Sequence, residues 1–92
     1  MKYKLELTKT ALQDIEKHKK AGDKAVLKKI GKLLEELTEH PKTGTGKPEK
    51  LKHDLSGLYS RRINREHRLV YEIKEEVVTV LVLSAHSHYG DK

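Results

Sequence analysis

The chain has 92 residues, of which 37% are charged and none is cysteine, and its formal net charge is +6. This length suits one compact domain, residues 1–92, with a modest core, and the lack of cysteine excludes disulfides, thiolate metal sites and cysteine nucleophiles. The N-terminal stretch MKYKLELTKT lacks the apolar centre of a secretion signal, and no apolar run is long enough to span a membrane, so we expect a cytoplasmic protein. The positive net charge favours nucleic acid as a partner.

A strand and a helix are expected at the start of the chain. Apolar and charged residues alternate over residues 2–7, which predicts a strand with one buried face. Thr8 can then cap a helix that Gly22 ends. The residues expected on one side of this helix, at helical spacing, are Ala11, Leu12, Ile15 and Lys19.

A second helix is expected between Asp23, which can cap it, and Pro41, which stops it. Its apolar positions recur at steps of three and four residues and are Val26, Leu27, Ile30, Leu33, Leu34 and Leu37. The two helices therefore form a hairpin. The following segment PKTGTGKP has no apolar anchor and is rich in proline and glycine, so it reads as an exposed loop.

The second half of the chain is expected to form strands at residues 58–64, 67–74 and 77–85. The polar links between them are short, which favours an antiparallel meander. Together with the first strand, this order gives an α+β domain, β-α-α-β-β-β, with the two-helix hairpin packed on one face of an antiparallel sheet. Alternation places Arg68 on the side of its strand away from Tyr71, and Tyr71 is expected to pack with its apolar neighbours.

The polar side chains of residues 46–74 are of the types that phosphate chemistry requires. The sequence contains no Ser-His-Asp order, Walker loop or dinucleotide fingerprint. Cleavage of RNA without a metal needs a base for the 2′-hydroxyl, a cation for the charge that develops on phosphate, and an acid for the leaving 5′-oxygen. Glutamate, arginine and histidine meet these three needs.

The contiguous segment GKPEKLKHDLSGLYSRRINREHRLVYEI, together with the HY pair near the end of the chain, resembles the Txe/YoeB toxins of bacterial toxin–antitoxin modules, which belong to the RelE/ParE superfamily. The resemblance implies a RelE-like fold and a metal-independent endoribonuclease that needs the ribosome, cuts mRNA in the A site, leaves a 2′,3′-cyclic phosphate and inhibits translation. It implies the ribosome, mRNA and a cognate antitoxin of the YefM, Axe or Phd kind as partners, with no cofactor and no membrane. A homodimer is a further possibility.

The same resemblance assigns four catalytic residues. It places the general base on Glu49, the phosphate-binding cation on Arg68, the general acid on His88, and an orienting or stacking ring on Tyr89. The sequence departs from the family where residues 90–92 follow the tyrosine, since the family usually ends there.

A basic patch is expected to hold the RNA backbone. Its residues are Lys47, Lys50, Lys52, His53, Arg61, Arg62 and Arg65. An ordinary solubilising surface would have the same composition.

Other readings of these residues stay open at this point. Glu49 could be a solvated loop charge, and the glutamates at positions 66, 72 and 76 are alternative partners for Arg68. His86 and His88 lie two apart, which on a strand would let them start a zinc or nickel site, although no metal is expected because no cysteine or carboxylate accompanies them at ligand spacing. A non-catalytic module that binds nucleic acid or a protein partner, or a gyrase-inhibiting relative, is the alternative function.

Overall fold

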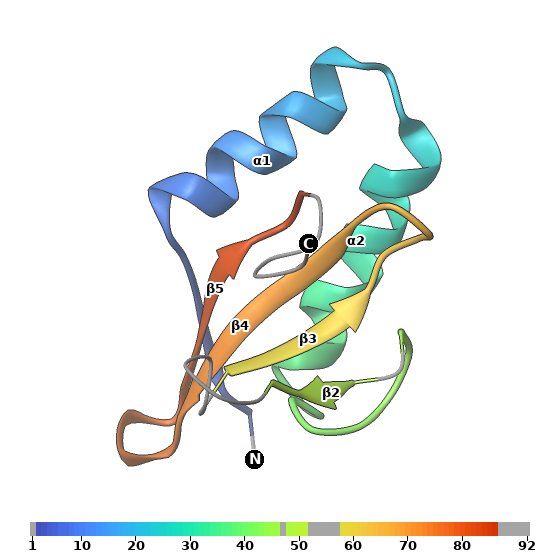
Figure 1. The fold of residues 1–92 in the computed structure, drawn as a ribbon. Coiled ribbons are helices and arrows are strands. Elements are labelled where there is room, and N and C mark those ends of the chain that lie inside the picture. The colour runs from blue at the N-terminus through green and yellow to red at the C-terminus, as the bar shows by residue number, and fades with distance from the viewer. Residues whose placement is uncertain (1, 47, 52–57, 87–92) are drawn as a thin grey trace.

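The computed structural model describes residues 2–46, 48–51 and 58–86 (Figure 1). Its helices and strands, in chain order, are β1 (Lys4–Leu7), α1 (Lys9–Lys20), α2 (Lys24–Leu37), β2 (Glu49–Lys50), β3 (Leu58–Arg62), β4 (Arg68–Lys74) and β5 (Thr79–Ser84). This order confirms the predicted α+β fold and adds one short strand, β2, in front of the meander.

The strands form one five-stranded sheet in the order β1-β5-β4-β3-β2. Neighbours from β2 to β5 are antiparallel, as the short links predict, but β1 runs parallel to β5. The sheet is therefore mixed, and the expectation of a wholly antiparallel sheet was wrong at this edge. Two helices separate β1 from the meander, so no hairpin dictates the direction of β1.

Both predicted helix caps are confirmed. The hydroxyl of Thr8 accepts a hydrogen bond from the backbone N–H of Ala11 at 3.1 Å, and the carboxylate of Asp23 accepts one from Val26 at 3.2 Å. Between the helices, Gly22 has a φ of +72°, a left-handed conformation that glycine adopts without a steric cost. This residue makes the tight turn that separates α1 from α2.

The buried face of α1 differs from the one that its apolar pattern predicted. Leu12 is 56% exposed, whereas Asp14 and His18 are buried beside Ala11. The two polar residues tolerate burial because both bind the backbone of Ala85. The Ala85 N–H donates to Asp14 Oδ2 at 3.0 Å, and His18 Nε2 lies 2.8 Å from the Ala85 carbonyl oxygen.

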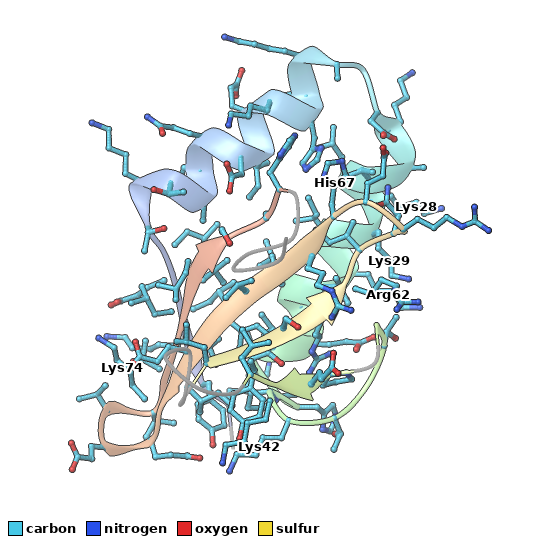
Figure 2. The ribbon with its side chains drawn as sticks, viewed as in Figure 1. Lys28, Lys29, Lys42, Arg62, His67 and Lys74 are labelled. Carbon is cyan, nitrogen blue, oxygen red and sulfur yellow. The ribbon has the colours of Figure 1, made fainter. Side chains whose placement is uncertain are left out.

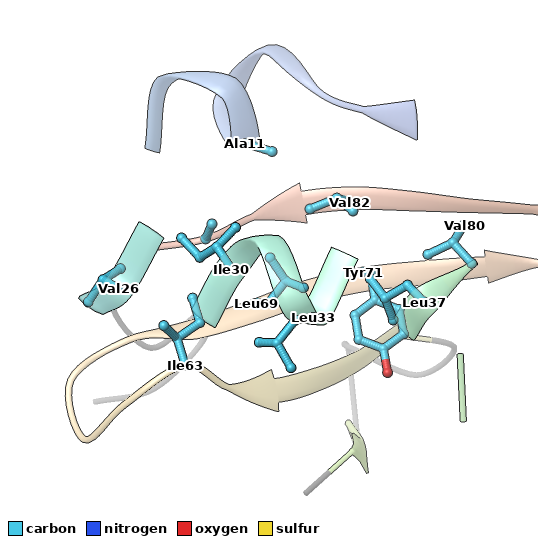
Figure 3. Close-up of a cluster of buried hydrophobic side chains, with 11 residues drawn as sticks. Ala11, Val26, Ile30, Leu33, Leu37, Ile63, Leu69, Tyr71, Val80 and Val82 are labelled. Atoms are coloured by element: carbon cyan, nitrogen blue, oxygen red, sulfur yellow. The ribbon is translucent and has the colours of Figure 1, made fainter. Parts of the chain in front are cut away.

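The core lies between the helices and one face of the sheet (Figure 3). It combines the apolar face of α2 with inward residues of β4 and β5, and its members are Ala11, Val26, Ile30, Leu33, Leu37, Ile63, Leu69, Tyr71, Val80, Val82 and Ala85. Neither α1 nor α2 is long and apolar enough to cross a membrane.

The last strand starts later than its apolar run predicted. Residues Glu75–Val77 form a 3₁₀ turn, and Val78 follows in a left-handed conformation with a φ of 46°. Pairing with β4 resumes at Thr79. Val77, the first residue of the apolar run, is 62% exposed in this turn and therefore does not belong to the strand.

Candidate active site

Cross-strand pairing brings Glu49 and Arg68 to one face of the sheet. Glu49 in β2 pairs with Ser60 in β3, and Arg62 in β3 pairs with Arg68 in β4. Paired residues share a face of the sheet and side chains alternate along each strand. All four side chains therefore belong to one face, and Arg61 and Tyr71 belong to the opposite face, which the helices cover.

Arg68 binds both Glu49 and Ser60. Its Nη1 atom donates to Glu49 Oε1 and to Ser60 Oγ, each at 3.1 Å. The side chain of Arg68 is 22% exposed and that of Glu49 is 62% exposed, so the ion pair is open to an incoming group. Ser60 is buried, and the hydrogen bond to its hydroxyl orients the guanidinium of Arg68.

These contacts settle which partner Arg68 takes within the described part of the chain. Arg68 forms its ion pair with Glu49, 19 residues before it, and not with the described glutamates of its own hairpin. Glu49 is therefore positioned by Arg68 and does not stand alone as a solvated loop charge. A carboxylate and a guanidinium in contact provide a proton acceptor and an anion-binding cation in one place.

A basic track extends from the face of the Glu49–Arg68 pair toward α2. An open hollow of about 270 Å³ is lined by Gly46, Pro48, Glu49, Arg62 and Arg68. A second hollow of about 320 Å³ is lined by Lys29, Gly46, Arg62, Ile63, Asn64 and Arg65. The two hollows share Gly46 and Arg62, and Lys29 from α2 lies near Arg62 (Figure 2). Their arginines and lysine suit a phosphate backbone that passes over the Glu49–Arg68 pair.

Gly46 allows the chain to approach β3 closely at the junction of the two hollows. The N–H of Arg62 donates to the Gly46 carbonyl at 2.7 Å, and Gly46 has a φ of +85°. A Cβ atom here would lie 2.8 Å from the backbone oxygen of Arg62. Only glycine combines this conformation with this distance, and it thereby fixes the chain that leads into Glu49.

Arg61 does not belong to the exposed basic patch, which corrects that part of the prediction. Its side chain has no exposed surface, and its guanidinium makes a 3.0 Å ion pair with Glu36 of α2. It also donates to the hydroxyl of Tyr71 at 3.2 Å and to backbone carbonyls of His40, Thr43 and Thr45. These bonds satisfy a buried cation and explain why it lies under the helices.

The same contacts revise the picture of the segment after α2. Pro41 is buried, and its carbonyl accepts a 2.7 Å hydrogen bond from the hydroxyl of Tyr71. Burial raises the pKa of Tyr71, which keeps this hydroxyl protonated as a donor. The segment predicted as an exposed loop is thus bound to the sheet through Arg61 and Tyr71, although Lys42, Thr43 and Gly44 are exposed.

The remaining predicted site residues divide into two groups. Lys50, Arg62 and Arg65 are exposed, as the basic patch requires. The others lie outside the described residues, and they are Lys47, Lys52, His53, His88 and Tyr89. The sequence reading missed Ser60 and Lys29. Strand alternation could have placed Ser60 beside Arg62, but Lys29 comes from α2 and had no local signal.

The two-helix layer on one face of the sheet, with a charged hollow on the other, gives the chain the fold of solved YoeB and RelE proteins. The chain belongs to the family described as YoeB-like toxins of bacterial type II toxin–antitoxin systems, whose family model matches residues 7–89. It is therefore the toxin of such a module.

Relatives and solved structures agree with this membership. Toxin YoeB of Escherichia coli strain K12 is 46% identical over 67 residues, which cover 73% of this chain and 77% of that protein. The YoeB dimer from Staphylococcus aureus is 38% identical with a TM-score of 0.82, and the match covers 97% of this chain and 100% of that chain. The YoeB–YefM complex from the same organism is 37% identical with a TM-score of 0.79, with the same coverage.

Proposed function

We propose that this toxin is a cytoplasmic endoribonuclease that cuts mRNA in the ribosomal A site, without a metal, and so inhibits translation. The single observation that carries the proposal is the exposed Glu49–Arg68 pair inside a basic hollow. In RNA, the 2′-hydroxyl and the phosphate that it attacks belong to the same nucleotide step. One base and one cation in contact can therefore serve both groups at once.

Glu49 acts as the general base. Its carboxylate accepts the proton of the 2′-hydroxyl, and the resulting oxygen attacks phosphorus to form the 2′,3′-cyclic phosphate. Its 62% exposure leaves room for the substrate hydroxyl, and the 3.1 Å bond from Arg68 holds it in place. Arg68 stabilises the negative charge that develops on the phosphate oxygens, while Ser60 keeps the guanidinium directed at the hollow.

The leaving 5′-oxygen needs a proton, and this role is proposed for His88 from the family resemblance alone. Tyr89 is proposed to orient the substrate or stack on a base. Lys50, Arg62 and Arg65, together with Lys29, hold the RNA backbone along the basic track. Lys47, Lys52 and His53 are proposed to extend it.

A cognate antitoxin of the YefM kind is the expected protein partner, since the Staphylococcus aureus relative is seen in a YoeB–YefM complex and also as a dimer. A cell can tolerate an mRNA-cleaving site only if it is covered, so an acidic segment of the antitoxin should occupy the basic hollow. A homodimer of the free toxin is proposed on the same ground. A complex that leaves Glu49 and Arg68 open, and still arrests translation, would contradict occlusion.

The experiment that tests the proposed function is cleavage of mRNA on purified ribosomes by Glu49→Gln. This variant keeps the shape of the side chain but removes the base, and the loss of a positioned base typically slows a reaction about 10²–10⁴-fold. Ribosome binding and the melting temperature should stay near those of the parent. A cleavage rate equal to that of the parent would refute the assignment and favour a non-catalytic binding module or a gyrase-inhibiting relative.

The role of His88 has its own test. A substrate whose leaving group needs no proton should restore much of the activity that His88→Gln loses and none of the activity that Glu49→Gln loses. Equal rescue of both variants would contradict the division of labour between acid and base.

A further inference from the structure

Three histidines from separate parts of the chain meet beside α1. His18 comes from α1, His67 immediately precedes β4, and His86 follows β5. One ring nitrogen from each lies within 4.8 Å of the others. The ring centroids are separated by 4.6 Å for His18 and His67, 4.9 Å for His18 and His86, and 4.4 Å for His67 and His86.

The backbone holds His86 next to His18. Ala85, the residue before His86, is bound to α1 through both of its backbone polar groups, with Asp14 as the acceptor and His18 as the donor. A carbonyl oxygen only accepts hydrogen bonds, so Nε2 of His18 must carry the hydrogen. In the neutral ring, Nδ1 then has the free lone pair, and this bond orients the ring as a metal-bound histidine requires.

His67 is fixed by the turn between β3 and β4. Its N–H donates to Asn64 Oδ1 at 2.8 Å, and its carbonyl accepts from the backbone N–H groups of Ile63 and Asn64 at 2.9 and 3.2 Å. Figure 2 labels His67 at this turn, near the junction of the two helices. The backbones that carry all three imidazoles are therefore held by hydrogen bonds before any ligand arrives.

We propose that His18, His67 and His86 bind one Zn²⁺ ion. Imidazole suits zinc, and three histidines with one position left for water form an established type of zinc coordination. With zinc–nitrogen bonds of about 2.0–2.1 Å, the ring centroids around one tetrahedral ion lie about 5 Å apart. The observed separations are close to this value, and zinc binding would require the half-buried His67 and His86 side chains to rotate until their ring nitrogens reach bonding distance.

Zinc bound here would cross-link three parts of the fold. It joins α1, the β3–β4 turn and the end of β5, which no disulfide can cross-link because the chain has no cysteine. His88, the partner of His86 in the metal site considered from the sequence, lies outside the described residues. The proposed cleavage reaction uses none of these three residues, so the zinc site goes beyond the proposed function and is tested separately.

Titration of the chelator-treated, full-length toxin with ZnCl₂, followed by calorimetry, tests the site. We expect one ion per chain and a higher melting temperature with zinc, because an ion that binds the folded state stabilises it. Cobalt should give the intense visible bands of a tetrahedral site. His67→Gln and His86→Gln should each lose one-to-one binding and the melting shift, without a loss of fold by circular dichroism.

His40→Gln is the matched control, since His40 is exposed, lies in the segment after α2 and does not belong to the cluster. It should bind zinc like the parent. The proposal is overturned if the parent binds no zinc, if His67→Gln and His86→Gln bind it as tightly as the parent, or if His40→Gln loses binding to the same extent as these two variants.

Discussion

Two glutamate–arginine pairs lie on opposite faces of β3 and β4, and they differ in burial rather than in chemistry. The Arg61–Glu36 pair has an N–O distance of 3.0 Å and side chains that are 0% and 22% exposed. The Arg68–Glu49 pair has a distance of 3.1 Å and exposures of 22% and 62%. Strand alternation, together with the pairing of Arg62 with Arg68, places Arg61 under the helices and Arg68 at the basic hollow.

The difference shows what each pair is built to do. Arg61 donates hydrogen bonds to one carboxylate, one hydroxyl and three backbone carbonyls, so it joins α2, the segment after α2 and β4. Within the described part of the chain, Arg68 binds Glu49 and Ser60, and both side chains of the Glu49–Arg68 pair are partly exposed to solvent. A buried pair holds elements together, whereas an open pair can exchange its internal bond for a substrate phosphate.

The largest expected effect on stability comes from breaking the buried pair. Arg61→Ala should lower the free energy of unfolding by about 3–5 kcal/mol, because it leaves Glu36, Tyr71 and the carbonyls without their shared partner. Urea denaturation measures this loss. Arg62→Ala is the matched control, since Arg62 is the next residue and is exposed, and it should change stability by only about 0.5 kcal/mol. Equal stability of the two variants would contradict the structural role of Arg61.

A smaller effect should appear in acid. Hydrogen bonds from Thr45 hold the pKa of Glu36 below its ordinary value of 4.5, and Arg61 adds to this effect. A carboxylate with a lowered pKa in the folded state stabilises the fold above its unfolded pKa. That contribution is lost as the pH falls below 4.5 and through the folded pKa.

Glu36→Gln removes the titrating group and should flatten the loss of stability in this pH range. Glu35→Gln, an exposed neutralisation on the same helix, controls for the change in net charge. If the two variants show the same dependence of unfolding free energy on pH, the stabilising bonds to Glu36 are not what acid disrupts.

The smallest effect concerns the exposed arginines of the basic track. Each phosphate contact releases counterions, so Arg62→Ala and Arg65→Ala should each lower the slope of log affinity against log salt by about 1. Binding to ribosomes or to RNA across a salt series measures the slope. Lys20→Ala, which removes an exposed cation from the end of α1, should leave it unchanged. A parent affinity that does not respond to salt would rule out the basic track.

The sequence predicted the local features of the fold well, because their causes are local. The caps at Thr8 and Asp23, the alternation in β1 and the short links of the meander each depend on neighbouring residues. The direction of β1 could not be predicted in this way, since its partner β5 lies more than 70 residues away.

The same distinction between local and distant causes applies to the candidate site. Glu49 and Arg68 were found through a contiguous motif shared with a toxin family, and the structure brings them together. Arg61 was misplaced because Arg61 and Arg62 are chemically alike and the partner that buries one of them, Glu36, lies 25 residues away on α2. The histidine cluster was missed for the same reason, because its members come from three distant segments.

Parallel measurement of cleavage and stability in Arg68→Ala tests the central claim most directly. Removal of the open pair should lower the single-turnover rate of mRNA cleavage on ribosomes by about 10²–10³-fold or more, as for a lost transition-state donor. The free energy of unfolding should fall by at most about 2 kcal/mol, because the ion pair is partly exposed and only the buried Ser60 hydroxyl loses a partner. A variant that cleaves at the parent rate, or one that loses activity only because it unfolds, would contradict the assignment of the Glu49–Arg68 pair as the active centre.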